Sequence, residues 1–298
     1  MEKQTYTFKV AEKCRIQADV YGISSDEVRP VIIWIHGGAL ILGHRGNINQ
    51  HQLEIYLNAG YTVISIDYRL APETKLKYII EDIQDAHSWV RGGADLLRID
   101  PDRMAVIGCS AGGYLTLMAG FCFNPRPMAL VSFYGYGDII GDWYKDPDPF
   151  YCQQPLVSKE DAWSVVGNTA ISEPSEPNNR GAFYLYCRQN GLWPEEVAGY
   201  NPYTEPEDFH QFCPVRNITG EYPPTLLLHG DKDTDVPYEQ SVMMAEELAS
   251  FGVEHELITI NGGGHGFDWV GAGDPVVADA FDRVLAFLNR HLSNVKTK

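Results

Sequence analysis

The pattern of hydrophobic and β-forming residues along the chain predicts eight short β-strands, six of them apolar runs. Residues 5–10 and 16–21 are rich in β-forming side chains and are separated by a polar turn, which is typical of an antiparallel pair. The six later runs are apolar without strict alternation, as expected of strands that are covered on both faces. They span residues 31–36, 62–67, 104–108, 129–134, 225–229 and 254–260.

Between several of these runs, apolar residues recur with helical spacing, which predicts amphipathic helices. The predicted helices span about residues 49–59, 78–91, 111–123, 238–251 and 275–292. Strands that alternate with helices of this length form β-α-β crossovers, so we expect an α/β fold with a mostly parallel sheet and helices on both faces.

One segment interrupts this alternation. Residues 137–222 contain nine prolines and fourteen aromatic residues, with only short helical patterns at 160–166 and 182–189. A disordered linker would be poor in aromatic side chains, so this composition favours an ordered insertion. We therefore expect one main domain, formed by residues 1–136 and 223–298, and a lid insertion of residues 137–222 after the sixth strand.

The net charge of the chain argues against some classes of binding partner. The 298 residues include 40 acidic and 23 basic side chains, for a formal net charge of -17. So negative a chain repels nucleic-acid phosphates and anionic lipid headgroups, which argues against nucleic-acid and membrane-surface binding. No stretch approaches the roughly 18 apolar residues of a membrane span, and the first residues lack the apolar core of a secretion signal. We therefore expect a cytoplasmic protein.

The six cysteines are scattered, without the Cys-x-x-Cys spacing or the paired histidines of a zinc site. We expect reduced packing residues and no metal. A bridge between Cys152 and Cys187, or between Cys187 and Cys213, stays open for an exported protein.

The strongest chemical signal is the segment 108–112, which reads Gly-Cys-Ser-Ala-Gly, follows an apolar strand and opens an apolar helix. This is the strand–turn–helix context that a G-x-S-x-G nucleophile elbow requires. The glycines permit a tight, strained turn, and the N-terminal end of the helix favours the negative charge that develops there. Ser110 is therefore the predicted nucleophile. Cys109 is the rival, but its turn position points the side chain back toward the sheet.

A second signal is His36-Gly37-Gly38 at the end of an earlier strand. Glycines let the main chain come close to an acyl oxygen. We expect the amides of Gly37 and Gly38, together with that of Ala111, to form an oxyanion hole. Without the elbow, the same residues would indicate only a tight turn.

The general base has to be a histidine in a loop at the carboxyl edge of the sheet. His265 follows the last predicted strand in such a loop, at 261–267. The other eight histidines lie in predicted strands or helices, in the turn at 36–38, or in loops outside the required order. His265 is therefore the predicted base.

Three carboxylates follow the strand at 225–229, and each could orient the imidazole. Asp231 is close enough to the strand to serve the turn itself. Asp235 is well placed to cap the helix that begins near Pro237. Spacing therefore favours Asp233, with Asp235 ahead of Asp231 as the alternative.

These motifs carry a family resemblance. The chain resembles the esterase/lipase and carboxylesterase members of the α/β-hydrolase superfamily through HGG at 36–38, DYRLAPE at 67–73, GxSAGG at 108–113, HGxxDxxVP at 229–237 and GxxHGF at 262–267. The resemblance covers about 31–136 and 225–292. It implies an eight-stranded sheet, Asp233 as the acid, and hydrolysis of a carboxylic ester without a cofactor. The chain departs from the hormone-sensitive-lipase relatives in having almost no N-terminal cap and in carrying its insertion after the sixth strand.

The aromatic residues of the insertion predict an apolar wall above Ser110 that suits short-chain or aromatic esters, with Trp143, Tyr144, Phe183 and Trp193 as its expected members. Two other functions stay open. An aminopeptidase or dipeptidyl-peptidase could use the adjacent pair Glu195-Glu196 to bind a free amino terminus, although Pro194-Glu-Glu is also an ordinary first helical turn. A catalytically silent binding protein could keep the same fold. A homodimer is also left open.

Overall fold

The computed structural model describes residues 3–23, 27–174, 180–270 and 274–293. Eight strands form one sheet in the order β1-β2-β4-β3-β5-β6-β7-β8. The pairs β1/β2 and β2/β4 are antiparallel, and all other neighbours are parallel. The strands are β1 Lys3–Ala11, β2 Cys14–Tyr21, β3 Arg29–Ile35, β4 Thr62–Ile66, β5 Ile99–Cys109, β6 Ala129–Phe133, β7 Thr225–Gly230 and β8 His255–Ile260. The prediction of an eight-stranded, mostly parallel α/β sheet is confirmed.

β5 is longer than its apolar run predicts. Its first residues are mostly polar, yet they pair with the start of β3, where Arg29 lies opposite Ile99 and Pro30 opposite Asp100. The register then shifts between Pro30 and Val31. Residues 100–103 are partly buried or exposed, so a search for apolar runs does not detect this part of the strand.

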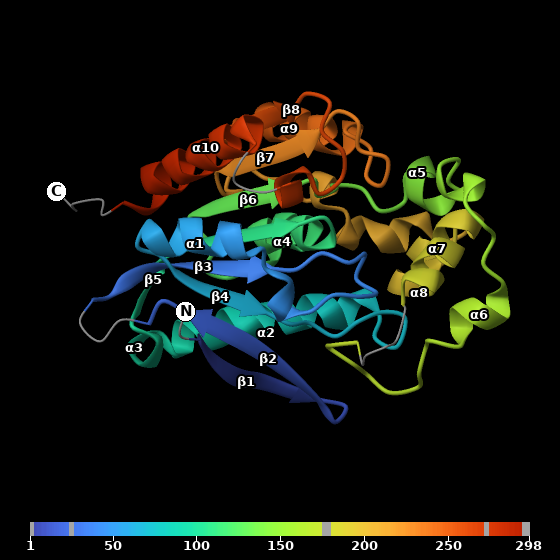
Figure 1. Ribbon diagram of the computed structural model, residues 1–298, viewed down its shortest axis with the longest axis horizontal. Coiled ribbons are helices and arrows are strands. Elements are labelled where there is room, and N and C mark those ends of the chain that lie inside the picture. The colour runs from blue at the N-terminus through green and yellow to red at the C-terminus, as the bar shows by residue number, and fades with distance from the viewer. Residues whose placement is uncertain (1–2, 24–26, 175–179, 271–273, 294–298) are drawn as a thin grey trace.

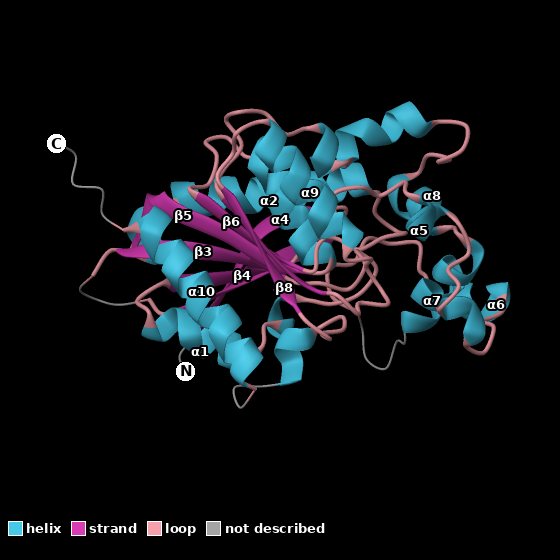
Figure 2. Cartoon of the chain, turned by 90° about the horizontal axis from the view of Figure 1, so that it is seen from above, coloured by secondary structure: helices cyan, strands magenta, loops and turns pink. Residues whose placement is uncertain are grey.

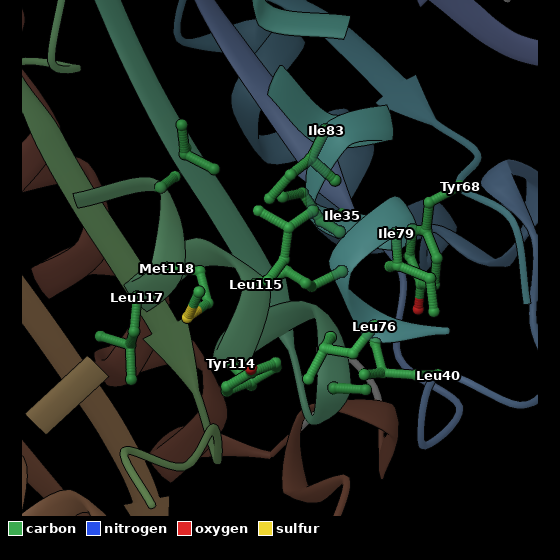
Figure 3. Packing of buried hydrophobic residues seen from close by; sticks show 14 of the residues in the cluster. Ile35, Leu40, Tyr68, Leu76, Ile79, Ile83, Tyr114, Leu115, Leu117 and Met118 are labelled. Carbon is green, nitrogen blue, oxygen red and sulfur yellow. The ribbon is translucent and has the colours of Figure 1, made fainter. Parts of the chain in front are cut away.

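The helices cover both faces of the sheet, as Figure 2 shows. Buried residues of α2, α4 and α9 belong to one apolar cluster and those of α1 and α10 to a second. Figure 3 shows the first cluster, with Leu115 of α4 lying close to Ile35 of β3 and Ile83 of α2. The helices are α1 Gln50–Asn58, α2 Leu76–Gly92, α3 Ala94–Leu97, α4 Ala111–Cys122, α5 Asp142–Lys145, α6 Lys159–Trp163, α7 Gly181–Asn190, α8 Trp193–Ala198, α9 Glu239–Ser250 and α10 Pro275–Leu292.

The chain between β6 and β7 lies beyond one end of the sheet (Figure 1). It contains α5 to α8 and three 3-10 helices, η2 Tyr151–Gln153, η3 Pro206–Phe212 and η4 Pro214–Arg216. Its buried residues Tyr144, Phe183 and Trp193 belong to the same apolar cluster as α2 and α4. We call it the β6–β7 segment. The apolar side chains of its described residues therefore continue the core of the sheet.

Two further 3-10 helices, η1 Arg45–Asn47 and η5 Phe267–Val270, follow β3 and β8 at the same edge of the sheet. The carboxyl ends of parallel strands meet at one edge, so the loops after β3, β5, β7 and β8 converge there. All predicted site residues outside the β6–β7 segment lie on these loops or at their start.

Candidate active site

The turn between β5 and α4 holds Ser110 in a strained conformation. Its φ and ψ are 56° and -122°, a combination that residues with a side chain rarely adopt. The turn is tight because Gly108 lies against Gly112: an added Cβ on Gly108 would lie 2.2 Å from the Gly112 carbonyl oxygen. The amide of Ser110 donates to the Phe133 carbonyl across the sheet. Ser110 is thereby placed at the first turn of α4, where backbone N–H groups have no intrahelical acceptor.

Cys109 is buried beside Ser110, and burial raises the pKa of its thiol to about 12. A thiol becomes a nucleophile as the thiolate. Near neutral pH this thiol is therefore protonated and a poor nucleophile, although Cys109 also lines the cavity beside Ser110.

Ser110, His265 and Asp233 form one hydrogen-bonded chain. His265 Nδ1 lies 2.7 Å from Asp233 Oδ2, and His265 Nε2 lies 3.1 Å from Ser110 Oγ. An ionised carboxylate only accepts hydrogen bonds, so the Nδ1 proton is donated to Asp233. In the neutral ring Nε2 is then free to accept the hydroxyl proton of Ser110. The three residues are brought together because each follows a strand, β5, β7 or β8, at the same edge of the sheet.

Asp233 is held as a carboxylate by several donors. Burial opposes its charge, but hydrogen bonds from His229 and His265 outweigh burial and hold the pKa of Asp233 well below its ordinary value. The backbone amides of Asp235 and Val236 also donate to Asp233 Oδ1. His229 Nε2 lies 3.2 Å from Asp233 Oδ2. His229, which the sequence places only at a strand end, is therefore a second contact of the acid.

His265 experiences opposing effects. Burial disfavours its charged form, but the hydrogen bond to Asp233 and the negative charges of Asp235, Asp233 and Asp268 outweigh burial, so the pKa of His265 lies above 6.5. The ring also meets Tyr134 edge-on at 4.6 Å between centroids. The imidazolium form that proton transfer would create is therefore electrostatically favoured.

The neighbouring carboxylates have other contacts. Asp231 accepts from the Gly262 amide and so links the loops after β7 and β8. The expectation that Asp235 caps the following helix is wrong: α9 begins at Glu239, and its N-cap residue Tyr238 makes no side-chain cap bond. Asp235 instead pairs with Arg188 of α7 at 2.8 Å. Its other oxygen, Oδ2, lies 3.4 Å from His265 Nε2.

The loop after β3 lies against the elbow. An added Cβ on Gly37 would lie 3.2 Å from Ser110 Cβ, so the main chain passes directly beside the predicted nucleophile. Gly38 has φ of 108°, and an added Cβ there would lie 2.1 Å from the Leu42 carbonyl oxygen. Ala111 is the first residue of α4. Gly37 and Gly38 line the same cavity as Ser110, and Ala111 follows Ser110 directly in the chain.

A cavity of about 340 Å³ opens above these residues. Aromatic side chains form much of its wall, and Trp269 at its rim is 55% exposed. The lining residues outside the hydrogen-bonded chain and the loop after β3 are Trp34, Asn47, Cys109, Tyr134, Tyr184, Asp235, Gly266 and Trp269.

The four aromatic residues expected at this wall are not among its lining residues. Tyr144, Phe183 and Trp193 are buried in the core, and Trp143 packs on Tyr144. The β6–β7 segment contributes Tyr184 instead, one residue from Phe183. Adjacent residues of a helix point in directions about 100° apart, so α7 turns Phe183 into the core and Tyr184 toward the cavity. Trp269 could have been predicted at the cavity from the sequence, because it follows the predicted base His265 by only four residues.

The pair Glu195-Glu196 lies in the first turn of α8 and is not among the cavity-lining residues. Glu195 accepts from the Asn201 side chain. In the part of the chain that the structure describes, no cluster of three or more His, Cys, Asp or Glu side chains is arranged to hold a metal ion. None of the described helices has the length and apolarity needed to cross a membrane.

Comparison with known proteins places these observations in a family. Residues 18–248 match the BD-FAE family. The non-reducing polyketide synthase Preu3 of Preussia isomera is 30% identical to 90% of this chain, and esterase LipC of Mycobacterium tuberculosis is 29% identical to 80% of it. The aligned regions are 13% of the synthase and 53% of LipC, so the chain spans only part of these relatives.

The fold has close structural counterparts. An α/β-hydrolase superfamily protein from Enterococcus faecalis superposes with a TM-score of 0.76 at 22% identity, covering 97% of this chain and 99% of that one. The sheet order, the elbow after β5 and the sequence match over 18–248 agree with one another. The chain therefore belongs to the BD-FAE family and has the α/β-hydrolase fold.

Proposed function

We propose that this protein is a serine hydrolase that cleaves carboxylic esters through an acyl-enzyme intermediate. The observation that supports the proposal most is the hydrogen-bonded chain from Asp233 through His265 to Ser110, which ends in an open cavity. Its relative LipC is named an esterase, which agrees with this chemistry.

In the proposed cycle, His265 removes the proton of Ser110 as its Oγ attacks the acyl carbon. The amides of Gly37, Gly38 and Ala111 donate to the oxyanion of the tetrahedral intermediate. His265 then protonates the departing alcohol and afterwards activates a water molecule that hydrolyses the acyl-enzyme. These steps need neither a metal nor an organic cofactor.

We infer that the substrate is a small ester with a short-chain or aromatic acyl group. A cavity of about 340 Å³ is at the lower end of the roughly 300–1,000 Å³ usual for ligand pockets. Its aromatic walls, Trp34, Tyr134, Tyr184 and Trp269, favour flat or compact groups. We also infer that residues 137–222 act as a cap on a catalytic domain of residues 1–136 and 223–298, because this segment supplies Tyr184 to the cavity wall.

The acyl preference is tested by measuring kcat/KM on acetate, butyrate, hexanoate, octanoate and palmitate esters. We expect a maximum at roughly two to six carbons, with each added methylene gaining at most about 1 kcal/mol while it still fits. A maximum at palmitate, or activation by emulsified triglyceride, would show a lipase instead.

Ser110→Ala tests the nucleophile. The side chain lies at the cavity and contributes little packing, so the variant should fold normally and lose ester hydrolysis. A fluorophosphonate probe should label the parent protein and not the variant. Residual turnover within tenfold of the parent would overturn the assignment, and an unlabelled parent would favour the non-catalytic alternative.

The peptidase alternative has less support. It needs an anionic group near the cavity to bind an amino terminus. The pair proposed for this, Glu195-Glu196, is not among the lining residues, and Asp235, which does line the cavity, is already paired with Arg188. Amino-acyl nitroanilides assayed beside p-nitrophenyl esters decide between the two reactions.

A further inference from the structure

The loop that carries the Gly37 and Gly38 amides is held in a costly conformation. After Gly38, both Ala39 and Leu40 have left-handed backbones, with φ of 55° and 63°. Residues with a Cβ adopt this region only where the surrounding structure imposes it. Within the loop, the amides of Ile41 and Leu42 both donate to the Gly38 carbonyl. The carbonyls of Ala39 and Ile41 are then left to partners outside the loop.

Those partners come from the β6–β7 segment. The indole Nε1–H of Trp193 donates to the Ala39 carbonyl at 2.9 Å, and Trp193 is fully buried. Arg180 Nε donates to the Ile41 carbonyl at 2.6 Å. Two side chains of this segment therefore hold the loop from outside, one at each side of Leu40.

Arg180 is itself fixed in place. Its Nη1 and Nη2 contact the two carboxylate oxygens of Glu73 at 2.9 and 2.7 Å, and Nη2 also donates to the Ala71 carbonyl. The Ala71 amide in turn donates to the Leu40 carbonyl. Arg180 and Glu73 are both almost fully buried. These contacts fix the position of the guanidinium, and its hydrogen bond to the Ile41 carbonyl in turn fixes the position of the loop.

Trp193 is fixed by aromatic stacking. Its ring lies on Tyr144 with 3.9 Å between centroids and an interplanar angle of 11°, and Tyr144 stacks in the same way on Trp143. The two tryptophans differ in one respect. Trp193 donates to the Ala39 carbonyl in the loop after β3, whereas the buried Nε1 of Trp143 has no hydrogen-bond partner among the described residues.

We propose that Trp193 and Arg180 are positioning residues that hold the loop at 37–42 so that the Gly37 and Gly38 amides point at the oxyanion. This inference rests on the proposed ester hydrolysis for its catalytic meaning, although the support of the loop is independent of it. Oxyanion donors act only when they are preorganised at the position where charge develops. A small displacement of that loop should therefore lower the rate of the chemical step more than substrate binding.

The test compares Trp193→Phe with Trp143→Phe. Both variants replace a stacked indole by a smaller ring, but only the first removes a hydrogen bond to the loop. We expect Trp193→Phe to lower kcat about tenfold or more with KM changed less than about twofold. Trp143→Phe should keep kcat within about twofold of the parent. Equal losses of kcat in the two variants, or a change confined to KM in Trp193→Phe, would overturn the proposal.

Amide hydrogen exchange gives a readout that does not need turnover. Exchange within residues 38–42 should become faster in Trp193→Phe and stay at the parent rate in Trp143→Phe. If the parent protein hydrolyses no ester, the proposed function fails, and this exchange measurement alone decides whether Trp193 holds the loop. Unchanged exchange in Trp193→Phe would contradict the inference whatever the activity.

Two further variants guard against misfolding of Trp193→Phe. Replacing Trp193 by the benzothiophene analogue of tryptophan removes the N–H donor and keeps the ring shape. Arg180→Lys keeps the positive charge beside Glu73 but removes the Nε–H that donates to the Ile41 carbonyl. Each should reproduce the loss of kcat and the faster exchange in the loop. If both variants fold and keep the kcat and the exchange rates of the parent, the roles assigned to Trp193 and Arg180 are refuted.

Discussion

Asp235 contacts both the β6–β7 segment and the predicted base. Its Oδ1 accepts from Arg188 and from the hydroxyls of Tyr151 and Tyr184, while Oδ2 faces His265 Nε2 at 3.4 Å. The sequence predicts a helix cap here, because an Asp before a helix usually serves that purpose. In the structure the Asp235 carboxylate pairs with Arg188 and does not cap the helix. The Arg188 side chain is buried, and a buried charge requires a partner of opposite charge.

The position of Asp235 predicts a change in the pH profile. The base must be neutral to accept a proton, and the pKa of His265 lies above 6.5, so kcat/KM should fall as pH drops through a value above 6.5. The groups facing the ring are Asp233, Asp235, Asp268, Tyr134 and Ser110. Asp235→Asn removes one negative charge that favours the imidazolium, so this acid limb should move to lower pH.

The control for this profile is Asp231→Asn, which removes a carboxylate from the same loop that contacts the Gly262 amide and not the imidazole. Its acid limb should match the parent. A shift to higher pH in Asp235→Asn, or equal shifts in the two variants, would show that Asp235 does not act on His265.

Asp233→Asn should have a much larger effect on rate. An amide side chain at this position can donate to Nδ1 and so favour the wrong imidazole tautomer, which should lower kcat by roughly three to four orders of magnitude. Single-turnover measurements on one p-nitrophenyl ester, with Asp231→Asn beside it, isolate this effect. Full loss of activity in Asp235→Asn with an active Asp233→Asn would reverse the assignment of the acid.

A buried ion pair joins the β6–β7 segment to the rest of the fold. Arg180, which precedes α7, meets Glu73 of the loop before α2, and both side chains are excluded from solvent. A buried pair is costly to break because the remaining charge is left without its counter-ion. The segment is therefore bound to the main sheet by polar contacts as well as by its shared apolar cluster.

Glu73→Gln should accordingly destabilise the protein by about 3 kcal/mol, the lower end of the usual range, because glutamine still accepts one hydrogen bond. Glu221→Gln is the matched control, since Glu221 is 87% exposed and lies 3.7 Å from Arg126. It should cost less than about 1 kcal/mol. Urea unfolding of both variants measures the difference, and equal values would mean that the buried pair contributes no more than an exposed one.

The net charge of -17 is the dominant electrostatic feature of the protein. Like charges repel most in the compact state, so screening should stabilise the fold. We expect Tm to rise when salt increases from about 0.01 M to about 0.15 M, over which the Debye length falls from about 30 Å to about 8 Å. Calorimetry at several KCl concentrations tests this, and a falling Tm would show that the exposed ion pairs outweigh the repulsion.

The sequence predicts what is local and misses what depends on packing between distant segments. Ser110, Asp233 and His265 lie within five residues of the ends of β5, β7 and β8, so strand–loop signals point to them, although those signals leave Asp235 open beside Asp233. Tyr184 and Trp34 reach the cavity only through the packing of α7 and β3, and no short-range pattern reports that contact. The same holds for Asp235, whose partner Arg188 lies on another element. Six of the strands are predictable from apolar runs and the first two from β-forming residues, whereas the polar start of β5 is not predictable from either.

The hydrogen bonds from Trp193 to Ala39 and from Arg180 to Ile41 have a consequence for protein engineering. A chimera that received the β6–β7 segment of a relative would lose both donors unless the incoming segment carried equivalents. Its loop after β3 would then keep its own sequence and still lose its shape. A chimera designed to change substrate range should therefore receive the loop at 36–43 and the segment at 137–222 together from the same relative.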